Sequence, residues 1–116
     1  RTSSMGYDIA AKTDAESVIP EEFGGMWFLK ESLEANTIGL TVLELEPGGT
    51  GKEHDESESG QEEIYYVVEG SVEVSVGAET VALGPDEAIR LDPSETRKIH
   101  NTGDERARLV LVGAPL

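Results

Sequence analysis

Apolar and polar residues alternate along much of the chain, in short runs separated by turn residues. The clearest case is Val72, Val74 and Val76, whose neighbours Glu73 and Ser75 are polar. This period of two is typical of a strand with one buried face. By the same reasoning, strands are predicted over 26–29, 37–46, 64–69, 72–76, 79–83, 87–91, 97–101 and 107–112.

Turn residues close most of these runs, as at Pro47-Gly48-Gly49, Gly84-Pro85-Asp86 and Asp92-Pro93-Ser94. Short strands with turn signals about every 8–12 residues, and no long helix, predict an all-β sandwich or barrel. Residues 30–35 predict one helical turn. Residues 6–22 are polar with scattered apolar positions, so we expect an extended arm that lies over the domain.

The length of 116 residues fits one domain with a modest core. We expect residues 1–4 to be a cloning remnant ahead of Met5, residues 5–36 to form the arm and the first short strand, and residues 37–116 to form the barrel. The absence of cysteine excludes disulfides, thiolate metal sites and a cysteine nucleophile. Neither a signal peptide nor an apolar run of roughly 20 residues is evident, so the predicted location is the cytoplasm.

The formal net charge is −15, from 24 acidic and 9 basic residues. Such a surface repels phosphate backbones and anionic lipids, so nucleic acid and membranes are not expected as partners. Eighteen Glu against four Lys also suggest the hypothesis that the protein is adapted to high salt, where screening removes self-repulsion.

Candidate chemistry gathers around the charged segment 52–62. Gly48 is separated from His54 by five residues, and Glu63 is separated from Gly70 by six. Between them lies a loop without an apolar residue, and Glu63 opens an apolar strand. An imidazole and a carboxylate are side chains of the kind that ligate divalent metals.

These spacings resemble the first motif of the cupin superfamily, G-x5-H-x-H-x3/4-E-x6-G. Glu56 stands where that motif has its second histidine, and the following loop is two or three residues longer. In the second motif, G-x5-P-x-G-x2-H-x3-N, Asn101 keeps its identity and Arg97 replaces the last histidine. Arginine stays protonated and cannot ligate a metal, although its guanidinium suits a carboxylate or phosphate.

The resemblance implies a cupin-type jelly-roll barrel, also called a double-stranded β-helix, that forms a homodimer and has a site inside. Cupins hold a divalent ion with three histidines and one glutamate, a set that leaves open positions for substrate. Strand alternation then predicts that Glu63, Tyr65 and Arg97 face the interior, and that His100 faces outward.

The candidate metal ligands are therefore His54, Glu63 and Glu56, and the candidate ligand-binding residues are Arg97 and Tyr65. Each also has a simpler interpretation. His54 would be a solvated loop residue, and Glu63 would form an interior ion pair with Arg97. Glu56 and the nearby Glu58 would be surface charges.

Three functions follow, and the sequence leaves the catalytic residues unknown. The first is a small-molecule binding domain with one divalent ion (Zn, Mn, Fe or Ni), or with no cofactor, in which Arg97 orients an anionic ligand. The second is a metal-dependent enzyme of the isomerase or dioxygenase type, with Glu63 or His54 as base. The third is a metal-free sensor or structural module.

Overall fold

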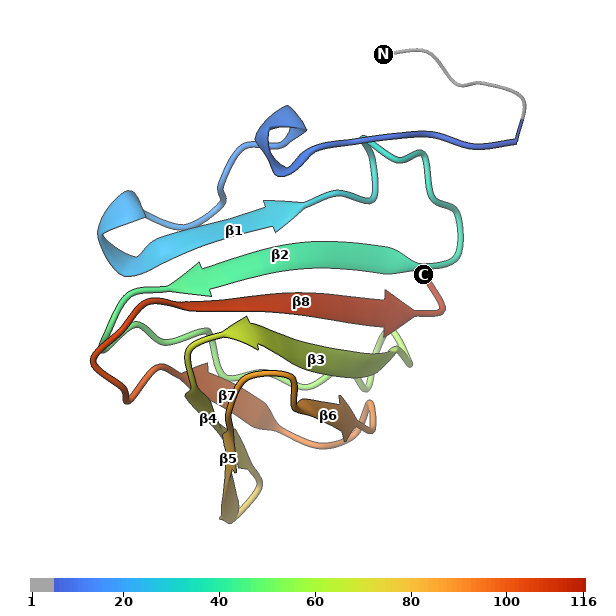
Figure 1. Cartoon of the computed structure of the whole chain (residues 1–116). Coiled ribbons are helices and arrows are strands. Elements are labelled where there is room, and N and C mark those ends of the chain that lie inside the picture. Colours follow the sequence, from blue (N-terminus) through green and yellow to red (C-terminus); the bar gives the residue numbers. More distant parts are fainter. Residues whose placement is uncertain (1–5) are drawn as a thin grey trace.

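The computed structural model describes residues 6–116, which form two β-sheets that pack face to face (Figure 1). The eight strands are β1 (Gly24–Phe28), β2 (Gly39–Leu45), β3 (Glu62–Glu69), β4 (Val72–Val76), β5 (Glu79–Leu83), β6 (Ala88–Leu91), β7 (Arg97–His100) and β8 (Ala107–Ala114). Two 3₁₀ turns, η1 (Lys12–Asp14) and η2 (Glu21–Phe23), precede β1. The predicted cloning remnant, residues 1–4, lies outside the described residues.

One sheet has five strands in the order β1-β2-β8-β3-β6, and the other has three in the order β5-β4-β7. Neighbouring strands pair antiparallel in both sheets. The prediction of an all-β domain is therefore confirmed. Within residues 6–116 there is no helix with the length and hydrophobicity needed to span a membrane.

Each predicted strand overlaps one observed strand, and the differences lie at the ends. β1 begins two residues earlier than predicted because Gly24 and Gly25, which carry no apolar signal, pair with Leu45 and Glu44 of β2. Residues 30–35 form hydrogen-bonded turns in which the Leu33 amide donates to the Leu29 carbonyl at 3.0 Å, a single helical hydrogen bond.

The core lies between the two sheets and is built from the inward-facing residues of each strand. Leu45 and Leu109 from the five-stranded sheet, and Val72 and Val74 from the three-stranded sheet, are almost completely buried. Their polar neighbours in sequence face outward, as the period of two predicts. Gly70, with φ of 77°, makes the bend between β3 and β4, where a Cβ atom would lie 2.9 Å from the Cα of Ala107.

The N-terminal segment follows the free edge of β1. The Val18 amide donates to the Met26 carbonyl at 2.9 Å, so this segment covers part of an otherwise unpaired strand edge. The ammonium of Lys12 lies 4.3 Å from the Trp27 ring centroid and donates to Glu44 Oε2 at 2.9 Å. These contacts attach the segment to the five-stranded sheet.

Glu44 connects the N-terminal segment to the loop before β8, because it also accepts two hydrogen bonds from Arg106. Burial by itself raises the pKa of the Glu44 carboxyl, but the hydrogen bonds and charges of Lys12 and Arg106 outweigh this effect and lower it. The folded state therefore holds Glu44 as a carboxylate.

We expect Glu44→Gln to destabilise the protein by about 1–2 kcal/mol at neutral pH, because hydrogen bonds between charged groups are replaced by weaker ones. A lowered folded-state pKa gives stability that is fully present above the unfolded pKa of about 4.5 and is lost as the pH falls through the folded-state pKa. Urea unfolding of both proteins at about pH 7 and about pH 3 should therefore show a smaller difference at the lower pH. Glu79→Gln, on the exposed strand β5, is the control. An equal difference at both pH values would contradict the role of the charge.

Candidate functional site

A cavity of about 860 Å³ opens inside the barrel. Much of its wall is apolar and is contributed by Ile19, Met26, Phe28, Leu43, Ile99 and Leu111. Its polar lining includes His54, Glu56, Glu63, Tyr65 and Arg97. The five candidate residues from the sequence thus line one cavity.

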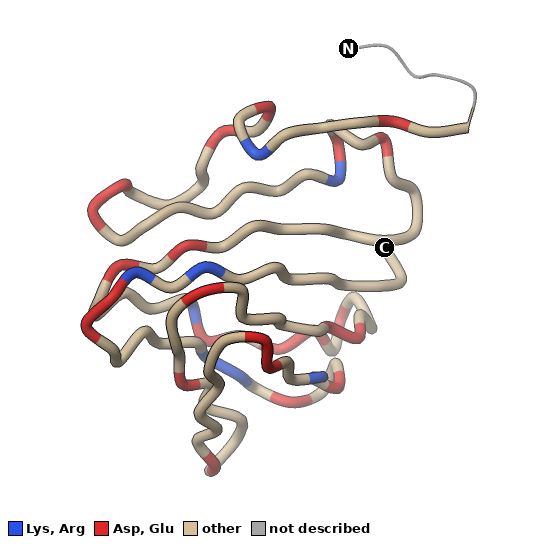
Figure 2. Tube along the Cα trace, viewed as in Figure 1, with Lys and Arg blue, Asp and Glu red and all other residues tan. Residues whose placement is uncertain are grey.

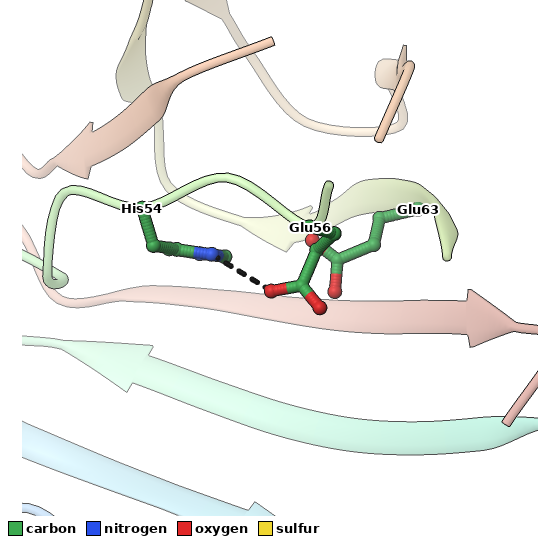
Figure 3. Close-up of side chains that lie close together, drawn as sticks. All are labelled: His54, Glu56 and Glu63. Atoms are coloured by element: carbon green, nitrogen blue, oxygen red, sulfur yellow. Dashed lines mark hydrogen bonds and ion pairs between the residues drawn. The ribbon is translucent and has the colours of Figure 1, made fainter. Parts of the chain in front are cut away.

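Three of these residues bring potential ligand atoms together (Figure 3). One atom each from His54, Glu56 and Glu63 lies within 4.8 Å of the others. The three side chains are partly buried, with 35%, 23% and 18% of their surface exposed. His54 and Glu56 come from the loop before β3, and Glu63 comes from β3 itself.

Main-chain bonds place the His54 loop against β7. The His54 amide donates to the Arg97 carbonyl at 3.0 Å, and the Arg97 amide donates to the His54 carbonyl at 2.8 Å. Two residues on, the Glu56 amide donates to the Pro93 carbonyl at 2.8 Å. The hydroxyl of Ser59 donates to Glu56 Oε1 at 2.7 Å, while Glu56 Oε2 lies 3.0 Å from His54 Nδ1. These bonds turn Glu56 toward the cavity.

Arg97 is the most unusual member of the site because its charged side chain is completely buried, with 0% exposed. Its Nη2 donates to Glu63 Oε1 at 2.7 Å, and its Nη1 donates to the carbonyls of Asp92 and Glu95 at 3.1 and 2.7 Å. Its Nε has no hydrogen-bond partner within residues 6–116. Burial lowers the pKa of Arg97, but the hydrogen bonds and charges of Glu63 and Tyr65 outweigh this, so it stays protonated.

Tyr65 lies beside this ion pair, with its hydroxyl 3.4 Å from Glu63 Oε1. Burial, followed by the negative charge of Glu63, raises the pKa of Tyr65 to about 12. Its phenol is therefore neutral at physiological pH and acts as a hydrogen-bond donor. Glu63 Oε1 lies between two donors, and no residue in 6–116 donates to Oε2.

The donor set fits one divalent ion. A neutral imidazole and two carboxylates suit Zn²⁺, Mn²⁺, Fe²⁺ or Ni²⁺ and leave coordination positions for a small molecule. The hydrogen bonds of Ser59 to Glu56 and of Arg97 to Glu63 are of the kind that orient ligating carboxylates. Arg97 itself cannot ligate a metal ion, so the described part of the chain offers three donors here.

Other sequence candidates lie away from the cavity. His100 is exposed and pairs with Glu73 of β4, as the strand register predicts. Glu58 is exposed and is not part of the donor group. Asn101 is fully buried, and its side-chain amide donates to the carbonyls of Leu45 and Glu105. Asn101 thus fixes the turn after β7.

Two parts of the cavity wall were missed by sequence reasoning. Residues 14–16 and Ile19 of the N-terminal segment line the cavity, as does Gln61 at the end of the charged loop. Residues 14–16 and Ile19 reach the cavity only because the N-terminal segment runs along the edge of β1. Local sequence carries no signal for such a long-range contact.

The chain belongs to the cupin family, since the family model described as "Cupin domain" matches residues 41–113. The solved structure of a cupin protein (BF4112) from Bacteroides fragilis is similar over 97% of this chain and 86% of that one, with a TM-score of 0.78 and 17% identity. Together with the two antiparallel sheets, this likeness confirms the predicted jelly-roll fold.

The curated relatives have diverse names. The chain is 33% identical to the tetracenomycin polyketide synthase protein TcmJ of Streptomyces glaucescens, over 92% of this chain and 73% of that protein. It is 37% identical to the polyketide synthase CurC of Streptomyces cyaneus, over 68% of this chain and 49% of CurC. It is 38% identical to the β-D-galactosidase Rv1717 of Mycobacterium tuberculosis, over 66% and 62%. The chain thus spans about half of CurC.

We expect Arg97→Leu to destabilise the protein by about 3–5 kcal/mol, because it leaves Glu63 without its buried counter-ion. The additional change Glu63→Gln should recover part of this loss, since it removes the unpaired charge. Chemical unfolding of the two single variants and the double variant gives the coupling energy. The control is Arg90→Leu, which removes an exposed arginine that also contacts two carboxylates. If Arg97→Leu and Arg90→Leu lowered the free energy of unfolding equally, the explanation that burial makes the Arg97 ion pair costly to break would be wrong.

Proposed function

We propose that this chain is a small-molecule-binding cupin domain in which His54, Glu56 and Glu63 hold one divalent ion. The convergence of their donor atoms within 4.8 Å, at the wall of a cavity of about 860 Å³, carries this proposal. The volume falls within the range of about 300–1,000 Å³ that is usual for ligand pockets. When bound, the ion would act as a Lewis acid toward a ligand oxygen.

The chain's own residues have distinct parts in this proposal. Arg97 positions Glu63, because both of its terminal nitrogens already donate to protein groups. We therefore prefer this role to the sequence-based expectation that Arg97 orients an anionic ligand. Tyr65 offers a neutral hydroxyl beside the ion pair, where it can donate to a ligand oxygen as well as to Glu63.

The ligand that fits best is a largely apolar molecule with oxygen atoms at one end. Two carboxylates, one guanidinium and a divalent ion leave a net charge of +1 at the polar end. That balance suits a neutral ligand, or one with a single negative charge, better than a dianion. The remaining wall, which includes Met26, Phe28 and Leu111, favours an apolar body. The names of TcmJ and CurC support an extended, oxygenated carbon skeleton.

A metal-dependent enzyme is the second candidate function, and it uses the same site. It is favoured by the partly buried carboxylate of Glu63, which lies at the polar end of the cavity and would act as the base only when it does not ligate the ion. The alternative of a metal-free module needs only the Arg97–Glu63 pair. A homodimer, a cytoplasmic location and adaptation to high salt remain expectations from the sequence.

We expect the purified protein, once stripped of metal, to bind one Mn²⁺ or Zn²⁺ per chain in isothermal titration calorimetry. His54→Ala should weaken this binding at least about tenfold, because one of three ligands is lost. His100→Ala is the matched control, since this second histidine is exposed and points away from the cavity. Absence of binding at millimolar metal, or equal affinities for the two variants, would refute the metal site.

We expect the neutral, tricyclic probe 1,8-dihydroxyanthraquinone to bind more tightly than glucose 6-phosphate. Leu111→Gln should weaken binding of the probe about tenfold, because an apolar contact of about 1.5–3 kcal/mol is replaced by an unpaired amide. Val110→Gln is the control, because it lies next to Leu111 on β8 but faces the outside of the sheet. Fluorescence titration measures both affinities. Preference for the sugar phosphate would contradict the proposed ligand class.

A further inference from the structure

Gln61 brings a neutral amide to the wall of the cavity, one residue before β3 begins. The residue is half-buried and lines the same cavity as the three candidate metal ligands. Its main-chain N–H donates to Ser59 Oγ at 3.3 Å, and Ser59 Oγ also donates to Glu56 Oε1. Its side-chain amide, in contrast, forms no hydrogen bond within residues 6–116. One acceptor oxygen and two N–H donors are therefore available to a ligand.

Strand pairing explains how this amide comes to lie beside Glu63. Glu63 pairs with Gly113 of β8, and Gly113 pairs in turn with Gly39 of β2. A Cβ atom on Gly113 would lie 3.1 Å from Gln61 Oε1 and 3.5 Å from Glu63 Oε2. Both oxygens therefore lie close to one point above the Gly113 backbone, at the polar end of the cavity.

Gly113 matters here because of the space that it leaves. It lies inside β8 and is not among the described glycines with positive φ, so its backbone would accept other residues. Glycine within a strand often marks a place that a ligand approaches closely. Figure 2 shows that the parts of β2 and β8 nearest the C-terminus carry no charged residue. Gln61 thus supplies a neutral polar group above an uncharged stretch of sheet, next to Glu63.

Gln61 Oε1 needs a hydrogen-bond donor, and its surroundings define which ligand group supplies one. In the proposed site the ion satisfies Glu63, which leaves the amide oxygen without a partner. An amide N–H turned toward the same point would face the positive charge of the ion, so the oxygen stays there. A ligand carboxylate in this place would meet two acceptor oxygens. A hydroxyl, in contrast, would donate to Gln61 Oε1.

We propose that Gln61 selects ligands with a hydroxyl group beside the carbonyl oxygen that binds the ion. This inference rests on the proposed function, because the ion fixes one end of the ligand. When one lone pair of the carbonyl binds the ion, the hydroxyl next to it is free to donate to Gln61 Oε1. A site built to hydrogen-bond a hydroxyl discriminates against an analogue that lacks it, because the site's own polar group is left unpaired.

The test compares 1,8-dihydroxyanthraquinone with 1-hydroxyanthraquinone, which lacks one of the two hydroxyls beside the carbonyl. With Mn²⁺ present, fluorescence titration of the parent should show about tenfold tighter binding of the dihydroxy probe. Gln61→Met keeps the length of the side chain but removes the amide, so it should bind the two probes equally well. Gly113→Ala should also reduce the preference, because its Cβ displaces the amide. Gly39→Ala is the matched control, since its Cβ would come no closer than 3.4 Å to a neighbouring atom, at the end of the Leu116 side chain.

Calorimetry of Mn²⁺ binding separates this inference from the proposed function. Gln61→Met should remain folded by circular dichroism and should bind Mn²⁺ as tightly as the parent, because the amide contacts the ligand and not the ion. Weaker Mn²⁺ binding by this variant would contradict the assigned role. If the parent binds Mn²⁺ but does not distinguish the probes, or if Gln61→Met keeps the full preference, the role of Gln61 is wrong and the metal site stands. A parent that binds no Mn²⁺ would instead overturn the proposed function, and this inference with it.

Discussion

A fully buried guanidinium is costly unless its charge and its donors are satisfied, and this constraint shapes the interior of the barrel. Arg97 meets most of it with one carboxylate, from Glu63, and with two main-chain carbonyls from the turn before β7, while its Nε has no partner within residues 6–116. The same residue forms two main-chain hydrogen bonds with His54. One arginine therefore holds β3, β7 and the charged loop in a fixed relation. Because Glu63 and His54 are both attached to it, the geometry of the candidate metal site depends on a residue that cannot bind metal.

Much of this arrangement could be predicted from the period of two. Once β3 and β7 are recognised as strands with their apolar faces inward, Glu63 and Tyr65 of one sheet and Arg97 of the other face the same interior, and His100 faces outward. The strand register agrees with both statements. The pattern could not predict which acceptor each nitrogen of the Arg97 guanidinium would bond. Sequence reasoning left the guanidinium with two uses, an anionic ligand or an ion pair with Glu63, and the structure shows its Nη2 on Glu63 and its Nη1 on the carbonyls of Asp92 and Glu95.

The remaining parts of the site depend on contacts between distant residues, and alternation has no information about these. Glu56 lies in a loop that is longer than the family motif, so spacing alone leaves its direction open. Its hydrogen bonds to Pro93 and Ser59 determine that direction. Likewise, Ile19 lines the cavity because the N-terminal segment follows β1, and Lys12 fixes this segment to Glu44 across the sheet. In both cases a polar segment without periodicity becomes ordered by the strands that it meets.

The replacement of imidazoles by a carboxylate and a guanidinium has consequences for the proposed chemistry. Carboxylate oxygens favour harder ions, such as Mn²⁺, more than imidazoles do, and three ligands from the chain leave much of the coordination sphere to water or substrate. In the proposed site, Glu63 would also be shared between the ion and Arg97, which would withdraw part of its charge. A site of this kind should bind its ion more weakly than a three-histidine site. A ligand that contributes oxygen atoms would then strengthen metal binding, so the ion and the ligand should each raise the affinity for the other.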